Sequence, residues 1–137
     1  MINISFIGMA ACGKSTIGKA VANKIGVSFV DTDLLIEQKH EATLEEIKNK
    51  YDYKFVRDEE EKVIRSLTSS NRIISTGGSA VYSAKSMEHL KKVSKVIYIN
   101  PPLDIIMQRI DIPSGTARPL FWLISILSII ISRGVFI

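Results

Sequence analysis

The residues best suited to chemistry lie near the N-terminus, in the run ISFIGMAACGKST, which contains the pattern Gly8-x4-Gly13-Lys14-Ser15. Glycines at this spacing let successive main-chain N–H groups turn toward a phosphate, and a helix that begins at the lysine adds partial positive charge. The lysine neutralises β- and γ-phosphates, and the serine hydroxyl is a ligand for Mg²⁺. The spacing therefore predicts a nucleoside triphosphate site with magnesium, in preference to a plain glycine turn with a solvated lysine.

The loop divides the expected contacts among consecutive residues. We assign ATP binding to Ala11, Cys12, Gly13, Lys14, Ser15 and Thr16. Lys14 is expected to act in catalysis through its charge, and Ser15 to bind the metal. Cys12 fills a variable position of the pattern, so we interpret it as a partly exposed loop residue without a catalytic role.

Two carboxylates, Asp31 and Asp33, follow a short apolar run at residues 27–30. Two residues apart on a strand, they project to the same side while Thr32 points away. Beside a magnesium-phosphate site, one carboxylate can hold metal-bound water while the other accepts a hydrogen bond from the hydroxyl that is phosphorylated. The alternative is that Asp33 only caps a helix beginning at Leu34.

Two further positions are open between a functional and a purely structural role. Arg57 precedes the acidic run at 58–61, where an arginine commonly forms an i,i+3 or i,i+4 ion pair on a helix surface. Gly77 and Gly78 allow a ligand to approach the main chain closely, but glycine pairs are also ordinary turns at strand ends.

Arg109 and Arg118 flank a segment, residues 111–117, that contains a proline and a glycine. Such a segment can act as a mobile lid near 111–118 that excludes water and brings a guanidinium onto the phosphates in the transition state. We therefore assign both arginines to ATP binding, and Arg118 also to catalysis.

The elements that must position these residues follow from apolar periodicity and turn signals. Strands are expected at residues 2–7, 27–30, 72–75 and 96–99. Helices are expected at residues 14–25, from a capping box at 43–46, over the charged stretch that carries Val63, Ile64 and Leu67 inward, and at 84–92 and 103–110. In the first helix, Ile17, Val21 and Ile25 recur at every fourth residue. His40 and His89 lie among polar helix residues, and we interpret them as solvated surface.

Short apolar strands that alternate with helices predict a parallel sheet with right-handed crossovers. We therefore expect an α/β protein with a three-layer P-loop NTPase fold, in which a parallel sheet of four to five strands carries helices on both faces. Ligands bind beyond the carboxyl ends of such strands. The loop at 8–15, the aspartates at 31–33 and the glycine turn at 76–79 should converge there on one crevice.

Composition sets the remaining limits. A chain of 137 residues is expected to form one domain, and a net charge of +4, scattered along the chain, gives no nucleic-acid footprint. The N-terminus lacks a signal-peptide pattern and there is one cysteine, so a cytoplasmic location is expected. The apolar run at 120–131 is shorter than the roughly 20 residues that span a bilayer. We expect small-molecule partners, no nucleic acid or membrane partner, and a monomer.

In this order, the motifs resemble those of the shikimate kinase family of small P-loop kinases. The resemblance covers about residues 2 to 121 and is carried by GMAACGKST at 8–16, FVDTD at 29–33, Arg57 with Glu60, STGG at 75–78 and RPL at 118–120. It implies transfer of the γ-phosphoryl group of ATP, with Mg²⁺, to the 3-hydroxyl of shikimate, a step of chorismate and aromatic amino acid biosynthesis.

The resemblance also implies a role for each matching position. Asp33 would hold the accepting hydroxyl, and Asp31 would support magnesium through water. Arg57 would grip the substrate carboxylate, where a planar guanidinium binds bidentately and lysine does not. Gly77 and Gly78 would contact the substrate through the main chain, and Arg118 would be the lid arginine. Arg133 would be a second arginine on the carboxylate, although chance placement explains it almost as well.

Three departures from the family pattern keep other functions open. Ser79 stands where the family has a third glycine, and Val56 where it has an aromatic residue. The segment at 119–137 is apolar in place of a charged helix, as expected of a truncated chain or an altered reading frame. The alternatives are a P-loop kinase for another hydroxylated acid or a nucleoside monophosphate, and a truncated nucleotide-binding protein without turnover.

Overall fold

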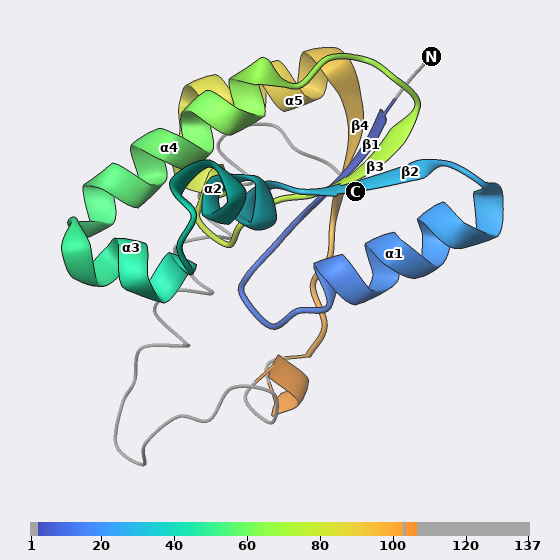
Figure 1. The fold of residues 1–137 in the computed structure, drawn as a ribbon. Helices are drawn as coiled ribbons and strands as arrows, with labels where there is room; N and C mark the ends of the chain where they lie inside the picture. The colour runs from blue at the N-terminus through green and yellow to red at the C-terminus, as the bar shows by residue number, and fades with distance from the viewer. Residues whose placement is uncertain (1–2, 103, 107–137) are drawn as a thin grey trace.

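The computed structural model describes residues 3–102 and 104–106 of the chain. At its centre is a parallel sheet with the strand order β2-β3-β1-β4 (Figure 1). The strands are β1 (Asn3–Ile7), β2 (Ser28–Asp31), β3 (Arg72–Ser75) and β4 (Ser94–Tyr98). Each strand overlaps its predicted range, and β3 matches it at both ends. The predicted α/β fold with a parallel sheet is confirmed.

Helices cover both faces of the sheet (Figure 1). On one face, α1 (Lys14–Ile25) packs through Ala22 against Phe6 and Ile73. On the other face, α4 (Tyr53–Ser66) and α5 (Ala84–Val93) bury Ile64, Met87 and Leu90 in a cluster that also includes Ile7 and Tyr98. The prediction that Val63, Ile64 and Leu67 point inward is confirmed, because each is at most 9% exposed.

The buried face of α1 is formed by small residues. The structure buries Gly18 and Ala22, while Ile17 is 42% exposed and Ile25 is 55% exposed. A Cβ atom at Gly18 would lie 2.6 Å from the Phe29 ring, so small residues let the helix lie close to the sheet. The helix predicted at residues 14–25 is confirmed with the same bounds, and its contact face is set by small residues.

The region between β2 and β3 also contains α2 (Thr32–His40) and α3 (Leu44–Lys50), and a 3₁₀ turn, η1 (Ala80–Tyr82), precedes α5. The predicted capping box at the start of α3 is present: Glu46 N–H donates to Thr43 Oγ1, and Thr43 N–H donates to a Glu46 carboxylate oxygen. Residues 104–106 are helical, and the rest of the helix predicted at 103–110 lies outside the described residues.

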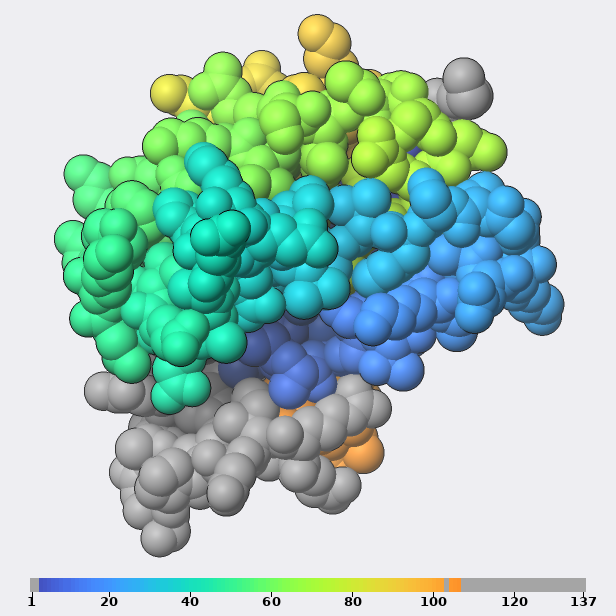
Figure 2. Space-filling model, in the orientation of Figure 1, coloured from blue at the N-terminus to red at the C-terminus, as the bar shows by residue number. Residues whose placement is uncertain are grey.

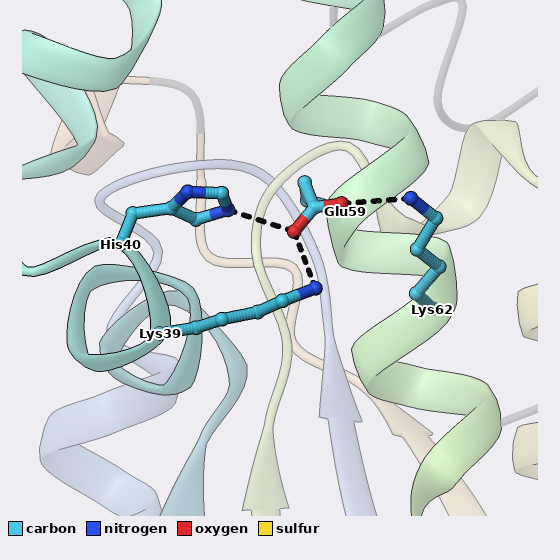
Figure 3. Close-up of polar contacts among 4 residues, drawn as sticks. All are labelled: Lys39, His40, Glu59 and Lys62. Carbon is cyan, nitrogen blue, oxygen red and sulfur yellow. Dashed lines mark hydrogen bonds and ion pairs between the residues drawn. The ribbon is translucent and has the colours of Figure 1, made fainter.

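Hydrogen bonds and ion pairs of Glu59 connect α2 with α4 (Figure 3). Its carboxylate is buried and receives Lys39 Nζ at 2.7 Å, His40 Nε2 at 2.7 Å and Lys62 Nζ at 2.9 Å. The hydrogen bond from Lys39 is the largest of the effects that lower the pKa of Glu59 to about 2. The interpretation of His40 as solvated surface was wrong, because its ring takes part in this bridge.

His89 was also expected at the solvated surface, but its Nε2 lies 2.7 Å from the Leu67 carbonyl oxygen in a partly buried contact. Among the described residues, none of the helices combines the length and apolar character needed to cross a bilayer.

Candidate active site

The loop between β1 and α1 is shaped for an anion. Gly13 caps α1 in the left-handed region, with φ of 96°, and provides no side chain to bond the first-turn N–H groups. The first turn of α1 also lacks acidic residues. Because these main-chain donors and the positive end of the helix dipole point outward together, they are suited to bind a phosphate.

Lys14 lies inside this loop. Its side chain is largely buried, and its ammonium group donates to the carbonyl oxygens of Gly8 at 2.9 Å and Met9 at 2.7 Å. Cys12 lies next to it and is only 2% exposed, in the same core cluster as Ile7. The expectation of a partly exposed cysteine was wrong, because the loop buries this side chain in that cluster.

Ser15 and Asp31 meet at the carboxyl edge of the sheet. Ser15 Oγ donates to Asp31 Oδ2 at 2.7 Å and lies 3.1 Å from Ser75 Oγ. Hydroxyl and carboxylate oxygens are the donors that Mg²⁺ prefers, so this set fits the ion. No group of three or more histidine, cysteine or acidic side chains suited to a metal occurs among the described residues. Phosphate oxygens and water would have to complete the coordination.

The two aspartates differ from their expected arrangement. The strand ends at Asp31, and α2 begins at Thr32, so Asp33 lies in the first helical turn. Asp31 is the cap, because its Oδ1 accepts from Asp33 N–H at 2.9 Å. The alternative role of Asp33 as a cap is therefore wrong, and its carboxylate is directed elsewhere.

Asp33 lies in a cavity of about 230 Å³ beside the phosphate-binding loop. The same cavity is lined by Met9 and Ala10 of the loop and by the predicted substrate residues, Arg57, Gly77 and Gly78. In Figure 2 a recess separates the teal surface of α2 and α3 from the blue surface of α1, with dark-blue atoms from near the N-terminus at its floor. The structure thus brings four residues from three parts of the sequence together next to the loop.

The carboxyl groups in this cavity have shifted pKa values. Burial is the main cause that raises the pKa of Asp33, and the neighbouring Asp31 raises it further, while Lys14 and Lys48 oppose the shift. Burial also raises the pKa of Glu60 to about 7, despite the hydrogen bond that Ser79 Oγ donates to Glu60 Oε2 at 2.6 Å. Shifts of this kind are typical of functional sites.

Arg57 has aromatic neighbours in place of the helix-surface ion pair that was one of its two possible roles. Its guanidinium carbon lies 5.1 Å from the centre of the Tyr53 ring and 4.7 Å from that of Tyr82. Within the described part of the chain, no carboxylate lies within ion-pair distance of Arg57. The interpretation of Arg57 as one half of an i,i+3 or i,i+4 pair is therefore wrong among these residues.

Comparison with known proteins agrees with this geometry. A family model described as shikimate kinase matches residues 10–126. The chain belongs to the shikimate kinase family. A shikimate kinase from Clostridium botulinum (strain Loch Maree / Type A3) is 36% identical over 121 residues, which cover 88% of this chain and 71% of the relative. For shikimate kinase 2 of Photorhabdus laumondii, identity is 33% over 114 residues, or 82% of this chain and 66% of the relative.

Solved structures of the family share the fold. The shikimate kinase from Acinetobacter baumannii in complex with shikimate has a TM-score of 0.82 and 30% identity, covering 97% of this chain and 78% of that one. For shikimate kinase from Bacteroides thetaiotaomicron, the TM-score is 0.76 and the identity is 28%, and the match covers 96% of this chain and 78% of that one. The predicted family and the predicted α/β P-loop fold are both confirmed.

A second cavity, of about 720 Å³, also borders the loop. It is lined by Ala11, Cys12, Gly13 and Thr16, four of the residues predicted to bind ATP, together with Ile99 and Pro101. This volume is within the range of about 300–1,000 Å³ found for sites of drug-sized ligands, which suits a nucleotide.

Several predicted residues lie outside the described residues: Arg109, Arg118, Arg133, the lid near 111–118 and the apolar segment at 119–137. Within the described part, Lys48, Tyr53 and Tyr82 line the cavity without having been predicted to, and Glu60 had been left without a role. The available signal was weak. Only the three-residue spacing from Arg57 to Glu60 placed that carboxylate on the cavity side of a helix.

Proposed function

We propose that this chain transfers the γ-phosphoryl group of ATP to the 3-hydroxyl of shikimate, as a step of chorismate and aromatic amino acid biosynthesis. One observation carries the proposal. The cavity that contains Asp33 and Arg57 opens directly against Met9 and Ala10 of the phosphate-binding loop. A hydroxyl bound there would lie next to the terminal phosphate, and positioning of this kind supplies much of the catalysis in phosphoryl transfer.

The nucleotide side depends on fixed positive charge. The first-turn N–H groups of α1 and the Lys14 ammonium would bind the phosphates and stabilise the charge that develops on them. Ser15 and Asp31 would hold Mg²⁺, the Asp31 carboxylate through water. When bound, the ion neutralises phosphate charge. Arg109 and Arg118 would act on the phosphates from the lid.

The acceptor side depends on groups of opposite charge that line the same cavity. Asp33 would accept a hydrogen bond from the reacting hydroxyl, and its raised pKa makes it a stronger base than an ordinary aspartate. Arg57 would bind the substrate carboxylate, with Arg133 as a second contact. Gly77 N–H already donates to Thr32 Oγ1 at 3.1 Å, so Gly78 is the better candidate for a main-chain contact with the substrate.

The size of the acceptor cavity favours a small acid over a nucleoside monophosphate. Its volume of about 230 Å³ is below the range of about 300–1,000 Å³ typical for drug-sized ligands. Shikimate is a small ring with one carboxylate and three hydroxyls, and it matches the charged groups that line the cavity.

A coupled assay of ADP release with shikimate and Mg-ATP tests the proposal. We expect release that depends on shikimate, with shikimate 3-phosphate as the product by mass spectrometry and ³¹P NMR. ATP binding without turnover would leave only a nucleotide-binding protein. Turnover with another hydroxylated acid, but not with shikimate, would reject the assigned acceptor and keep the kinase chemistry.

A further inference from the structure

Two cations share one aromatic ring at the wall of the acceptor cavity. Lys48 Nζ lies 5.6 Å from the centre of the Tyr53 ring, and the Arg57 guanidinium carbon lies 5.1 Å from the same centre. Lys48 belongs to α3, whereas Tyr53 and Arg57 belong to α4. All three residues line the acceptor cavity.

These positive charges form no ion pair in the described part of the chain. Every ion pair found there uses the carboxylate of Glu59 or Glu61, and none includes Lys48 or Arg57. A cation–π interaction with an aromatic ring stabilises a cation by only about 0.5–1 kcal/mol in exposed positions, so it replaces a carboxylate partner only in part. Two neighbouring cations that are not ion-paired to a carboxylate therefore form a site that favours an anion.

The position of Lys48 is fixed by packing of its helix. Ile47, the preceding residue, is 2% exposed in the cluster between α2, α3 and α4. Leu44, one turn earlier on the same side of α3, also lines the cavity. The stacked rings of Tyr51 and Phe55, 4.0 Å apart, hold the end of α3 against α4. Packing of α3 against α2 and α4 therefore fixes the position of Lys48 at the cavity.

We propose that Lys48 is a second cationic contact for the carboxylate of the acceptor, acting with Arg57 from the opposite helix; this inference rests on the proposed function. One guanidinium and one ammonium can bind the two oxygens of a single carboxylate, with the Tyr53 ring setting the spacing between the cations. Lys48 would then contribute to acceptor affinity and to selection of acids over uncharged alcohols, with little effect on phosphoryl transfer itself.

Lys50 provides a matched control on the same helix. Its Nζ lies 5.4 Å from the centre of the Tyr51 ring, so it makes a similar ring contact, but it does not line the acceptor cavity. Lys48→Gln and Lys50→Gln therefore remove the same charge from the same helix, and only the first removes it from the cavity. Lys48→Arg restores the charge.

The test compares these variants by steady-state kinetics with shikimate and with its methyl ester, which lacks the carboxylate charge. For Lys48→Gln we expect the KM for shikimate to rise about tenfold, equivalent to about 1.4 kcal/mol, with kcat and the KM for ATP changing less than about threefold. Lys50→Gln should match the unmodified chain, and Lys48→Arg should recover most of the affinity. With the ester, Lys48→Gln should differ from the unmodified chain by less than about twofold.

Equal KM values for the two glutamine variants would overturn the inference, and so would an undiminished defect with the ester. Isothermal titration with shikimate separates this result from failure of the proposed function. If the unmodified chain binds shikimate more tightly than Lys48→Gln but does not turn it over, the carboxylate contact stands and the kinase proposal fails. If the unmodified chain does not bind shikimate, both fail.

Discussion

Asp33 and Glu60 approach the same point from two different helices. A Cβ atom at Gly77 would lie 2.6 Å from Asp33 Oδ1 and still closer to Glu60 Oε1. Burial raises the pKa of both carboxyl groups, and the charge of Asp33 adds to the shift of Glu60. The glycine turn after β3 therefore sets the spacing between the proposed base and the helix that carries Arg57.

Gly77→Ala should damage the acceptor site more than it damages the fold. The new methyl group must displace one or both carboxylates, because real Cβ contacts are not shorter than 3.0 Å. We expect kcat/KM for shikimate to fall by about 100-fold, as for a misplacement of roughly 1 Å, and the free energy of unfolding to fall by about 1–3 kcal/mol.

Gly26→Ala is the control, measured by the same kinetics and by urea denaturation. Its Cβ would meet nothing within 4 Å, but its φ of +71° makes alanine strained. It should lose about 1 kcal/mol of stability and keep the acceptor KM. Normal kinetics for Gly77→Ala would show that the spacing does not matter.

Asp33→Asn should separate acceptor chemistry from nucleotide binding. Asparagine keeps the size of the side chain but cannot take the hydroxyl proton, so kcat should fall by about 100- to 10,000-fold. The Kd for ATP should change little, because Asp33 lines the acceptor cavity and is not among the residues that line the larger cavity. Asp58→Asn is the control, because it removes an exposed charge on α4, and it should keep a normal kcat. Normal activity of Asp33→Asn would refute the role of Asp33 as the base for the acceptor hydroxyl.

Arg57→Ala should abolish activity with the carboxylated acceptor by raising its KM at least about 100-fold, since a lost charged contact is worth roughly 2–5 kcal/mol. The Kd for ATP, measured by titration calorimetry, should change little. Arg65→Ala serves as the control, because Arg65 lies on the same helix and pairs with Glu61 at 3.8 Å away from the acceptor cavity. Unchanged shikimate turnover in Arg57→Ala would reject the assignment.

Glu60 should make stability depend on pH near neutrality. Its pKa is raised to about 7 in the folded chain from an ordinary 4.5, so the folded state binds a proton that the unfolded state releases between these values. The free energy of unfolding therefore falls as pH rises from about 4.5 to 7. Glu60→Gln lacks this loss, so its stability relative to the unmodified chain should increase across that range in urea denaturation. A constant difference between the two proteins would contradict the shift.

Glu59 should have the opposite dependence. Its pKa is lowered to about 2 from 4.5, so its contribution is complete above about pH 4.5 and is lost as pH falls toward 2. Glu59→Gln should lower the free energy of unfolding by about 2 kcal/mol at pH 7, as expected for lost hydrogen bonds between charged groups. The deficit should shrink in acid. Glu88→Gln, at an exposed position on α5, is the control and should lower the free energy of unfolding by less than about 0.5 kcal/mol. Equal losses in the two variants would contradict a stabilising role for the contacts of Glu59.

The positions of the helices and strands were predicted from local sequence patterns, each contained within a single segment of the chain. The glycine loop, the bounds of α1 and β3, and the capping box at Thr43 each depend on residues within a few positions of one another. The loop pattern was also sufficient to predict a phosphate site, because its chemistry needs only consecutive main-chain N–H groups and one lysine.

Tertiary structure alone decided which side chains share a site. Ser79 donates a hydrogen bond to Glu60, 19 residues away in the sequence. Lys48 and Arg57 both lie near the Tyr53 ring only because α3 packs against α4. The buried face of α1 was likewise set by how close the sheet lies to Gly18. These contacts depend on the distances between packed elements, which apolar periodicity within a single segment does not encode.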